Sequence, residues 1–217
     1  MTYTTRDYQG RVNGIFGSQI LKVDGVYGPN TKRHVQEAMR VKDVKMPHEL
    51  FTKGIRGIVW HWTAGASGII DLERDSYNWL FDTEGRIYKG LHTVTDQVNY
   101  DWRKDIGASH TKSMNTGWLG LSLDAMAGAK ESPLEWGFNP ITWKGIDAML
   151  DHTMDLCESY DIPISPWTTL SHAEVQQTLG ITQRFKWDYK VLHGYTHAKD
   201  ARLVGDELRE RMMERSG

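Results

Sequence analysis

Hydrophobic and polar positions follow two periods along the chain, and together they predict both strands and helices. Residues 55–62 read as a buried strand that brings a histidine, His61, to its end. Residues 118–123 are apolar enough for a central strand of a sheet. Apolar residues recur every three or four positions from Thr142 to Tyr160, which predicts a helix with one buried side.

Shorter elements complete the main domain. Residues 70–77 are expected to form a short helix, and residues 78–89 a hairpin that turns at Glu84-Gly85. Residues 167–170 form a predicted strand leading into His172. Strands intermixed with helices predict an α/β fold, with a mixed central β-sheet flanked by helices and a small N-terminal helical module. A last amphipathic helix follows residue 198, and its buried side is expected to carry Leu203, Val204, Leu208 and Met212.

The first 45 residues are predicted to form a module of their own, and residues 46–217 the main domain. Asp24-Gly25 is typical of a turn, and Asn30 or Thr31 can cap a helix that ends near Arg40. Glycines at positions 10, 14 and 17 weaken any helix before it. So few apolar residues make a marginal core, and we therefore expect the module to lean on the main domain.

Composition excludes several classes of function. A net charge of −2 over 217 residues gives no electrostatic reason to bind nucleic acid or an anionic membrane. No apolar run is long enough for a spanning helix, and the first residues lack the apolar core of a secretory signal. We therefore expect a protein, most simply a monomer, made in the cytoplasm without a signal peptide and not inserted in a membrane.

The single cysteine, Cys157, excludes an internal disulfide framework. It lies on the apolar side of the predicted helix, which favours a buried small hydrophobic residue over a nucleophile. The chain also has nine tryptophans, and a subset of these could face carbohydrate while the others pack in the core.

His61 and His172 share one context, since each stands at or just past the end of an apolar strand. Neighbouring strand ends can bring two such histidines together, and zinc then needs a third donor, with a fourth position open for water in a catalytic site. Asp188 can supply that donor, with Lys186 on the same side of an extended segment. On composition alone this is weak, because nine histidines can be paired in many ways. The others are expected to be ordinary surface or core residues: His34, His48, His92, His152, His193 and His197.

A resemblance to a known family gives this arrangement more weight. The runs VWHWTAG, YNWLFDTEGRIYKG, GASHTKSMNTGWLGLSL and SHAEV…KWD resemble the zinc-dependent N-acetylmuramoyl-L-alanine amidases, which include phage lysins and the related peptidoglycan recognition proteins. The match covers about residues 55–190, in the family's order. It implies a peptidoglycan hydrolase with one catalytic Zn2+. The implied metal ligands are His61, His172 and Asp188, the catalytic residues Lys186 and Tyr77, and the substrate-binding residues His110 and Asn115.

The N-terminal module also resembles a known module, and the main domain differs from the amidase family at two places. VDGVYGPNT with its trailing helix resembles the small peptidoglycan-binding module of cell-wall hydrolases, although a simple cap on the catalytic domain is the alternative. The stretch from His172 to Asp188 is longer than in the smallest members, so residues 178–180 are expected to loop out. Asp124 stands where many members have glycine, which is expected to alter the floor of the groove.

The sequence also allows other functions. A relative that lacks a complete zinc site would only bind peptidoglycan, and the presence of Asp188 argues against that reading. A zinc endopeptidase of the peptide stem would use the same chemistry on another bond. A purely structural zinc site is disfavoured by the open ligand position. A phage lysin would explain a wall-active enzyme without a signal, although a phage-particle component or a bacterial protein exported by another route fits equally.

Overall fold

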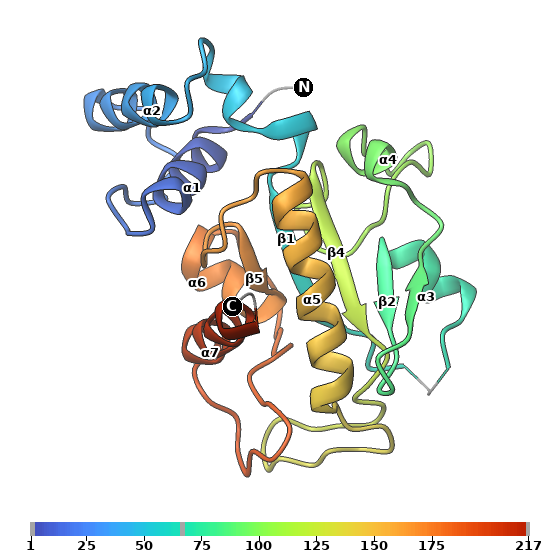
Figure 1. Ribbon diagram of the computed structural model, residues 1–217. Helices are drawn as coiled ribbons and strands as arrows, with labels where there is room; N and C mark the ends of the chain where they lie inside the picture. The colour runs from blue at the N-terminus through green and yellow to red at the C-terminus, as the bar shows by residue number, and fades with distance from the viewer. Residues whose placement is uncertain (1–2, 66–67, 216–217) are drawn as a thin grey trace.

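A five-stranded mixed β-sheet lies at the centre of the computed structural model, which describes residues 3–65 and 68–215 (Figure 1). Its strand order is β3-β2-β4-β1-β5; β1 is parallel to β4 and β5, β2 is parallel to β4, and β3 is antiparallel to β2. This confirms the predicted α/β class. The outer ends of the two predicted domains, residues 1–2 and 216–217, lie outside the described residues. The strands are β1 (Gly57–Trp62), β2 (Trp79–Phe81), β3 (Ile87–Lys89), β4 (Trp118–Leu123) and β5 (Thr169–Ser171).

Helices surround this sheet, and the longest of them, α5, crosses in front of β1 and β4 in Figure 1. The predicted long helix, short helix, hairpin and last helix are all present, with ends within a few residues of those expected. Within the described part of the chain, no helix has both the length and the apolar character that a membrane span requires. The helices are α1 (Thr5–Phe16), α2 (Pro29–Val41), α3 (Asp71–Ser76), α4 (Val94–Val98), α5 (Trp143–Ser159), α6 (Val175–Leu179) and α7 (Ala201–Arg215), with 3-10 turns at Pro47–Leu50, Thr52–Gly54 and His172–Glu174.

The two faces of the sheet differ in chemistry because side chains alternate along each strand. Trp60 and Trp62 of β1 enter the main core, where Trp60 Nε1 donates to Thr153 Oγ1 of α5 at 3.0 Å. The opposite face carries His61 on β1 and Ser122 on β4, which are register partners and both buried. One face therefore supplies the main apolar core, and the other combines polar groups near the strand ends with a smaller apolar cluster that includes Val59 and Leu170.

Three expectations about these elements were wrong. Helix α1 forms despite Gly10 and Gly14, and Gly14 lets the helix lie close to Ser165, because a Cβ there would come within 3.1 Å of Ser165 Oγ. Residues 175–179 form α6 instead of looping out, since Leu179 is buried in an apolar cluster. Leu203 is 65% exposed, so the buried side of α7 carries only the other three predicted residues.

The N-terminal segment is joined to the main domain by buried polar contacts. Arg11 is 1% exposed; its Nε donates to Leu50 O at 2.7 Å and its Nη2 to Asp161 O at 2.5 Å. Arg6 Nη1 donates to Leu179 O at 3.0 Å, which reaches α6. Burial lowers the pKa of Arg11 to about 10, so the guanidinium is still charged at neutral pH. These contacts hold the segment as a docked unit.

Substituting Arg11 should measure this docking. Arg11→Ala leaves two carbonyl oxygens without a charged donor, and we expect the free energy of unfolding to fall by about 2–4 kcal/mol. Urea denaturation followed by circular dichroism gives the value. The control is Arg33→Ala on the exposed side of α2, which should change stability by less than about 0.5 kcal/mol. Equal losses in the two variants would show that Arg11 does not dock the segment.

Candidate metal centre

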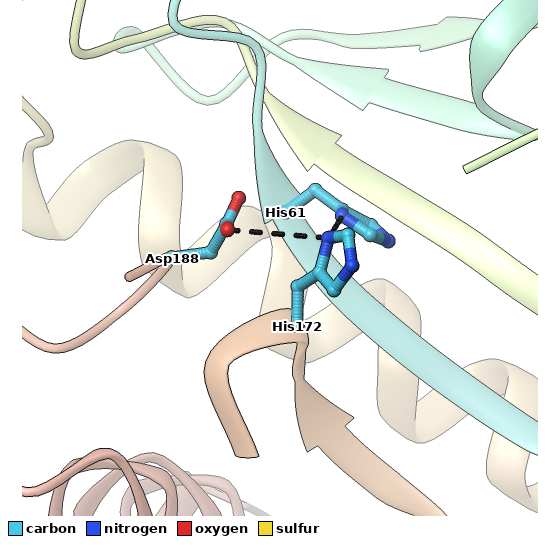
Figure 2. A group of neighbouring side chains, drawn as sticks. All are labelled: His61, His172 and Asp188. Carbon is cyan, nitrogen blue, oxygen red and sulfur yellow. Dashed lines mark hydrogen bonds and ion pairs between the residues drawn. The ribbon is translucent and has the colours of Figure 1, made fainter. Parts of the chain in front are cut away.

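Three side chains from distant parts of the sequence meet at the carboxyl edge of the parallel strands. His61 is the second-last residue of β1, and His172 directly follows β5, its parallel neighbour. Asp188 comes from the loop before α7 and accepts the backbone N–H of Trp62 at 3.3 Å. Figure 2 shows the two imidazoles and the carboxylate turned toward one another. This is the convergence predicted for His61, His172 and Asp188.

The distances among these groups suit a metal ion of zinc's size. His61 Nδ1 lies 3.1 Å from His172 Nδ1, and His172 Nδ1 lies 4.0 Å from Asp188 Oδ2 (Figure 2). One donor atom of each residue lies within 4.8 Å of the other two, and all three residues are buried. Tetrahedral zinc with bonds of about 2.0–2.1 Å needs neighbouring donors roughly 3.3 Å apart. The three residues can therefore hold a metal ion after small shifts.

The hydrogen-bond partners of His61 decide which of its nitrogens has a free lone pair. His110 Nε2 lies 3.0 Å from Trp118 O, and a carbonyl oxygen only accepts, so His110 carries its proton on Nε2. His110 Nδ1 is then an acceptor, and it faces His61 Nε2 at 3.2 Å. Thr111 Oγ1 also lies 2.9 Å from His110 Nδ1, but one hydroxyl proton cannot satisfy two facing lone pairs. When His61 Nε2 donates to this nitrogen, His61 Nδ1 is left with a lone pair that faces His172.

The hydrogen-bond partner of His172 likewise decides which of its nitrogens carries the proton. Gln183 Nε2 donates to Lys112 O at 3.0 Å, which fixes the orientation of the amide and turns Gln183 Oε1 toward His172. His172 Nε2 lies 3.1 Å from that oxygen and must donate to it. His172 Nδ1 is consequently unprotonated as well. Both imidazoles thus direct a lone pair into the same space, beside a carboxylate.

Burial keeps these histidines neutral. It lowers the pKa of His61 well below its usual value, helped by the neighbouring His172, His110 and Lys186. It also lowers the pKa of His172 to about 4 and that of His110 to about 4. No proton separates the two Nδ1 atoms at neutral pH, so their approach is unfavourable unless a cation lies between them. The donor set of two neutral imidazoles and one carboxylate is that of zinc sites with an open position.

Asp188 adds negative charge to the same buried space. Burial raises the pKa of its carboxyl to about 6, although the charge of Lys186 and the N–H of Trp62 act in the opposite direction. The carboxyl is therefore ionised at pH 7 but poorly solvated. A bound cation would offset that cost.

Tyr77 and Lys186 both lie beside these three residues. The Tyr77 ring is tilted against the His61 ring, with centroids 5.1 Å apart. Burial raises the pKa of the Tyr77 phenol, and the nearby charge of Asp188 raises it further. The exposed Lys186 is close enough for its charge to influence both histidines and Asp188. The predicted catalytic residues are thus next to the predicted ligands.

His110 and Asn115 lie in the loop before β4, on the same side of the sheet as His61. The His110 ring is buried, and its centroid is 5.2 Å from that of His61. Asn115 is partly buried, and its Oδ1 accepts the backbone N–H of Thr111 at 2.8 Å. Their contact with substrate remains a prediction, since the polar contacts found for these two side chains are with the protein itself.

A second group of possible ligands occurs among the described residues, at Asp75, His92 and Asp105. Here both nitrogens of the histidine are already engaged. His92 Nε2 lies 2.9 Å from Asp75 Oδ1, and His92 Nδ1 accepts the N–H of Gly107 at 3.2 Å. This group is a histidine–carboxylate hydrogen bond joined to a backbone hydrogen bond, and it leaves no histidine lone pair for a metal.

Comparison with solved structures finds two neighbours of low similarity, both from Clostridium intestinale URNW. The first, N-acetylmuramoyl-L-alanine amidase LysC, is 13% identical, has a TM-score of 0.41, and the match covers 73% of this chain and 89% of that one. The second, the endolysin N-acetylmuramoyl-L-alanine amidase LysCS, is 14% identical with the same TM-score of 0.41, covering 73% of this chain and 87% of that one. No family model and no curated protein matches the chain. At this similarity the neighbours carry no argument about function, which therefore rests on the site.

Three residues that support the site were missed by sequence reasoning. Gln183 orients His172, and Thr111 contacts His110. Gln97 holds the loop that carries His110 through hydrogen bonds to Ala108 O and Asn115 O. Glutamine and threonine are common on protein surfaces, so residue type gives no signal here. Only the three-dimensional contacts reveal their positions.

Metal titration should distinguish the two groups of possible ligands. The metal-free protein is expected to bind one equivalent of zinc, because one site presents free lone pairs. His172→Ala should abolish stoichiometric binding and Asp188→Ala should weaken it, while His92→Ala should still bind one equivalent. Equilibrium dialysis with elemental analysis measures all four proteins. Loss of zinc in His92→Ala but not in His172→Ala would place the metal in the other group.

Proposed function

We propose that this chain is a zinc-dependent N-acetylmuramoyl-L-alanine amidase that hydrolyses bacterial peptidoglycan. The observation that carries the proposal is the approach of the Nδ1 atoms of His61 and His172 to within 3.1 Å of each other, beside the carboxylate of Asp188. The choice of substrate is supported by the motifs that surround these residues in the sequence, in the order found in that family. The bond to be cleaved is the amide between the lactyl group of N-acetylmuramic acid and L-alanine.

Hydrolysis of this bond needs both a better electrophile and a better nucleophile than a neutral amide and water. A zinc ion held by His61, His172 and Asp188 supplies Lewis acidity, which polarises a carbonyl group and makes water acidic near pH 7. In the reaction, a water oxygen bonds to the carbonyl carbon, the C–N bond breaks, and the amine of L-alanine takes up a proton. The remaining tasks, charge stabilisation and proton handling, fall to the side chains around the ligands.

Lys186 is suited to stabilise negative charge. Lys186 is exposed, and its charge acts on the three ligands although it makes no hydrogen bond to any of them. It is therefore free to approach the substrate's carbonyl oxygen, on which negative charge develops. A preorganised donor of this kind contributes about 3–4 kcal/mol to the transition state in other enzymes.

Tyr77 is suited to donate a hydrogen bond. Burial and the charge of Asp188 keep its phenol protonated, so the phenol cannot serve as a general base at neutral pH. Its ring packs against His61, which brings it close to the position of the reacting water. We assign it the role of orienting that water or passing a proton toward the leaving amine.

The N-terminal unit, residues 1–45, is proposed to bind the wall beside the catalytic domain, residues 46–217. Its VDGVYGPNT run supports wall binding, and its buried contacts through Arg11 support a fixed position on the domain. We further propose that the protein is a phage lysin that acts as a monomer on the cell wall. Its net charge of −2 gives no electrostatic reason to bind nucleic acid instead.

Digestion of purified peptidoglycan tests the reaction itself. The zinc-loaded protein should clear the walls and release stem peptides that begin with a free L-alanine amine, and a chelator should stop both effects. Mass spectrometry of the products identifies the new termini. Cleavage within the peptide stem would indicate an endopeptidase instead, and binding to walls without any product would indicate a recognition protein.

Replacing Lys186 tests the division of roles. Lys186→Ala should retain one equivalent of zinc while its turnover number falls about 10²–10³-fold, because charge stabilisation is lost and the ligands are unchanged. Arg184→Ala is the matched control, since Arg184 is also exposed on this loop but exerts no resolved effect on the ligands. Near-normal turnover in Lys186→Ala would contradict the assigned role.

A further inference from the structure

His110 occupies a space that strand β4 leaves open for it. Its ring lies against Gly120, where an added Cβ would come within 2.6 Å of His110 Cγ. Any larger residue at this strand position would therefore displace the imidazole. The ring is 8% exposed, and the backbone carbonyl of Trp118 holds it from the Nε2 side. His110 is thus fixed in position by both shape and hydrogen bonding.

The nitrogens of His110 are both engaged within the protein. Nε2 donates to Trp118 O at 3.0 Å, and Nδ1 lies 3.2 Å from His61 Nε2 and 2.9 Å from Thr111 Oγ1. A substrate could bond to this side chain only by displacing one of these partners. Its geometry is suited to act on His61 and unsuited to a direct substrate contact.

The same loop also acts on the other histidine ligand. Lys112, two residues after His110, offers its carbonyl oxygen to Gln183 Nε2 at 3.0 Å. That bond turns Gln183 Oε1 toward His172 Nε2, which lies 3.1 Å away. Residues 107–117, defined here as the orienting loop, therefore contact one ligand through a side chain and the other through a backbone carbonyl.

The orienting loop is held in place by a buried amide. Gln97 is 0% exposed; its Nε2 donates to Ala108 O at 3.0 Å and to Asn115 O at 2.8 Å, and its Oε1 accepts from the N–H of Ala108 at 2.8 Å. Asn115 Oδ1 closes the loop internally by accepting the N–H of Thr111 at 2.8 Å. These bonds fix the backbone on both sides of His110.

We propose that His110 and Gln183 are positioning residues that set the protonated nitrogen of the two histidine ligands, so that both Nδ1 lone pairs face the metal. This inference rests on the metal site of the proposed function. It assigns His110 a role through His61 in place of the substrate contact implied by the sequence resemblance. It also makes the orienting loop a single element that prepares both ligands before any metal arrives.

The physical reason is the choice between two tautomers of a neutral imidazole. With its proton on Nδ1, His61 would present an N–H where the metal needs a lone pair, and His172 would do the same. The acceptors His110 Nδ1 and Gln183 Oε1 favour the productive tautomer of each ring. Loss of such an outer partner typically weakens metal affinity about 10–100-fold.

Substitutions at His110 test the first half of the proposal. His110→Phe keeps a ring in the space beside Gly120 but removes the acceptor, and we expect zinc affinity to fall about 10–100-fold. His110→Gln restores an acceptor oxygen and should recover part of that loss. The control is His152→Phe, because His152 lies on α5, where its ring is tilted against that of Trp79 on the other face of the sheet. Zinc affinity is measured by competition with a chromophoric chelator, with circular dichroism to confirm folding.

Gln183 is tested in the same way. Gln183→Leu removes the acceptor for His172 Nε2 and should weaken zinc binding by a similar factor, whereas Gln177→Leu on the exposed side of α6 should not. Unchanged affinity in folded His110→Phe and Gln183→Leu would overturn the proposal. A loss of affinity confined to these two variants and absent from the controls would support it.

A spectroscopic measurement on the wild-type protein covers the case in which a variant does not fold. Long-range 1H–15N spectra of the metal-free protein at pH 7.5 should show His61 and His172 protonated on Nε2 and unprotonated on Nδ1. The Nδ1–H form of either ring would overturn the proposal. Failure of the wild-type protein to bind zinc would instead reject the proposed function, and the tautomers would still be decided by this spectrum.

Discussion

Two neutral imidazoles that direct lone pairs at each other from 3.1 Å create the constraint on which this site depends. The arrangement is unfavourable in isolation, and a nearby buried carboxylate adds negative charge to the same space. A cation resolves both problems at once. The parallel strands β1 and β5 bring His61 and His172 together, and burial keeps both rings neutral. The fold thus prepares a metal site through position and protonation together.

The two faces of the sheet differ in what they carry: one holds the main apolar core, and the other holds His61 beside a smaller apolar cluster that includes Val59. Trp60 and Trp62 fill the core beneath α5, so β1 is held rigidly from one side. On the other side, His61 projects toward the orienting loop, and the small residue Gly120 of β4 makes room for His110. A ligand placed near the end of a rigid strand is well suited to precise metal geometry. The N-terminal unit adds a docked layer through Arg11, beside α5 and the turn that follows it.

Much of this architecture could be predicted from the sequence because it depends on local periodicity. The buried stripe of α5, the hairpin turn and the strand ends that carry His61 and His172 are all encoded by neighbouring residues. Asp188 could be named from its place two residues after Lys186, and the family resemblance then gave that weak assignment its weight. The contact between His61 and His110 joins residues 49 positions apart, and that between Gln183 and Lys112 joins residues 71 apart. Such pairings, like the tolerance of glycine in α1, depend on tertiary packing that no local pattern encodes.

The most direct test is a crystal structure of the zinc-loaded protein with anomalous data collected at the zinc absorption edge. We expect one strong peak bonded to His61 Nδ1, His172 Nδ1 and a carboxylate oxygen of Asp188, with bonds of about 2.0–2.2 Å. His110 and Gln183 should keep their hydrogen bonds to the outer nitrogens of the two ligands. A peak bonded through Nε2 of either histidine, or one found only beside His92, would contradict this expectation.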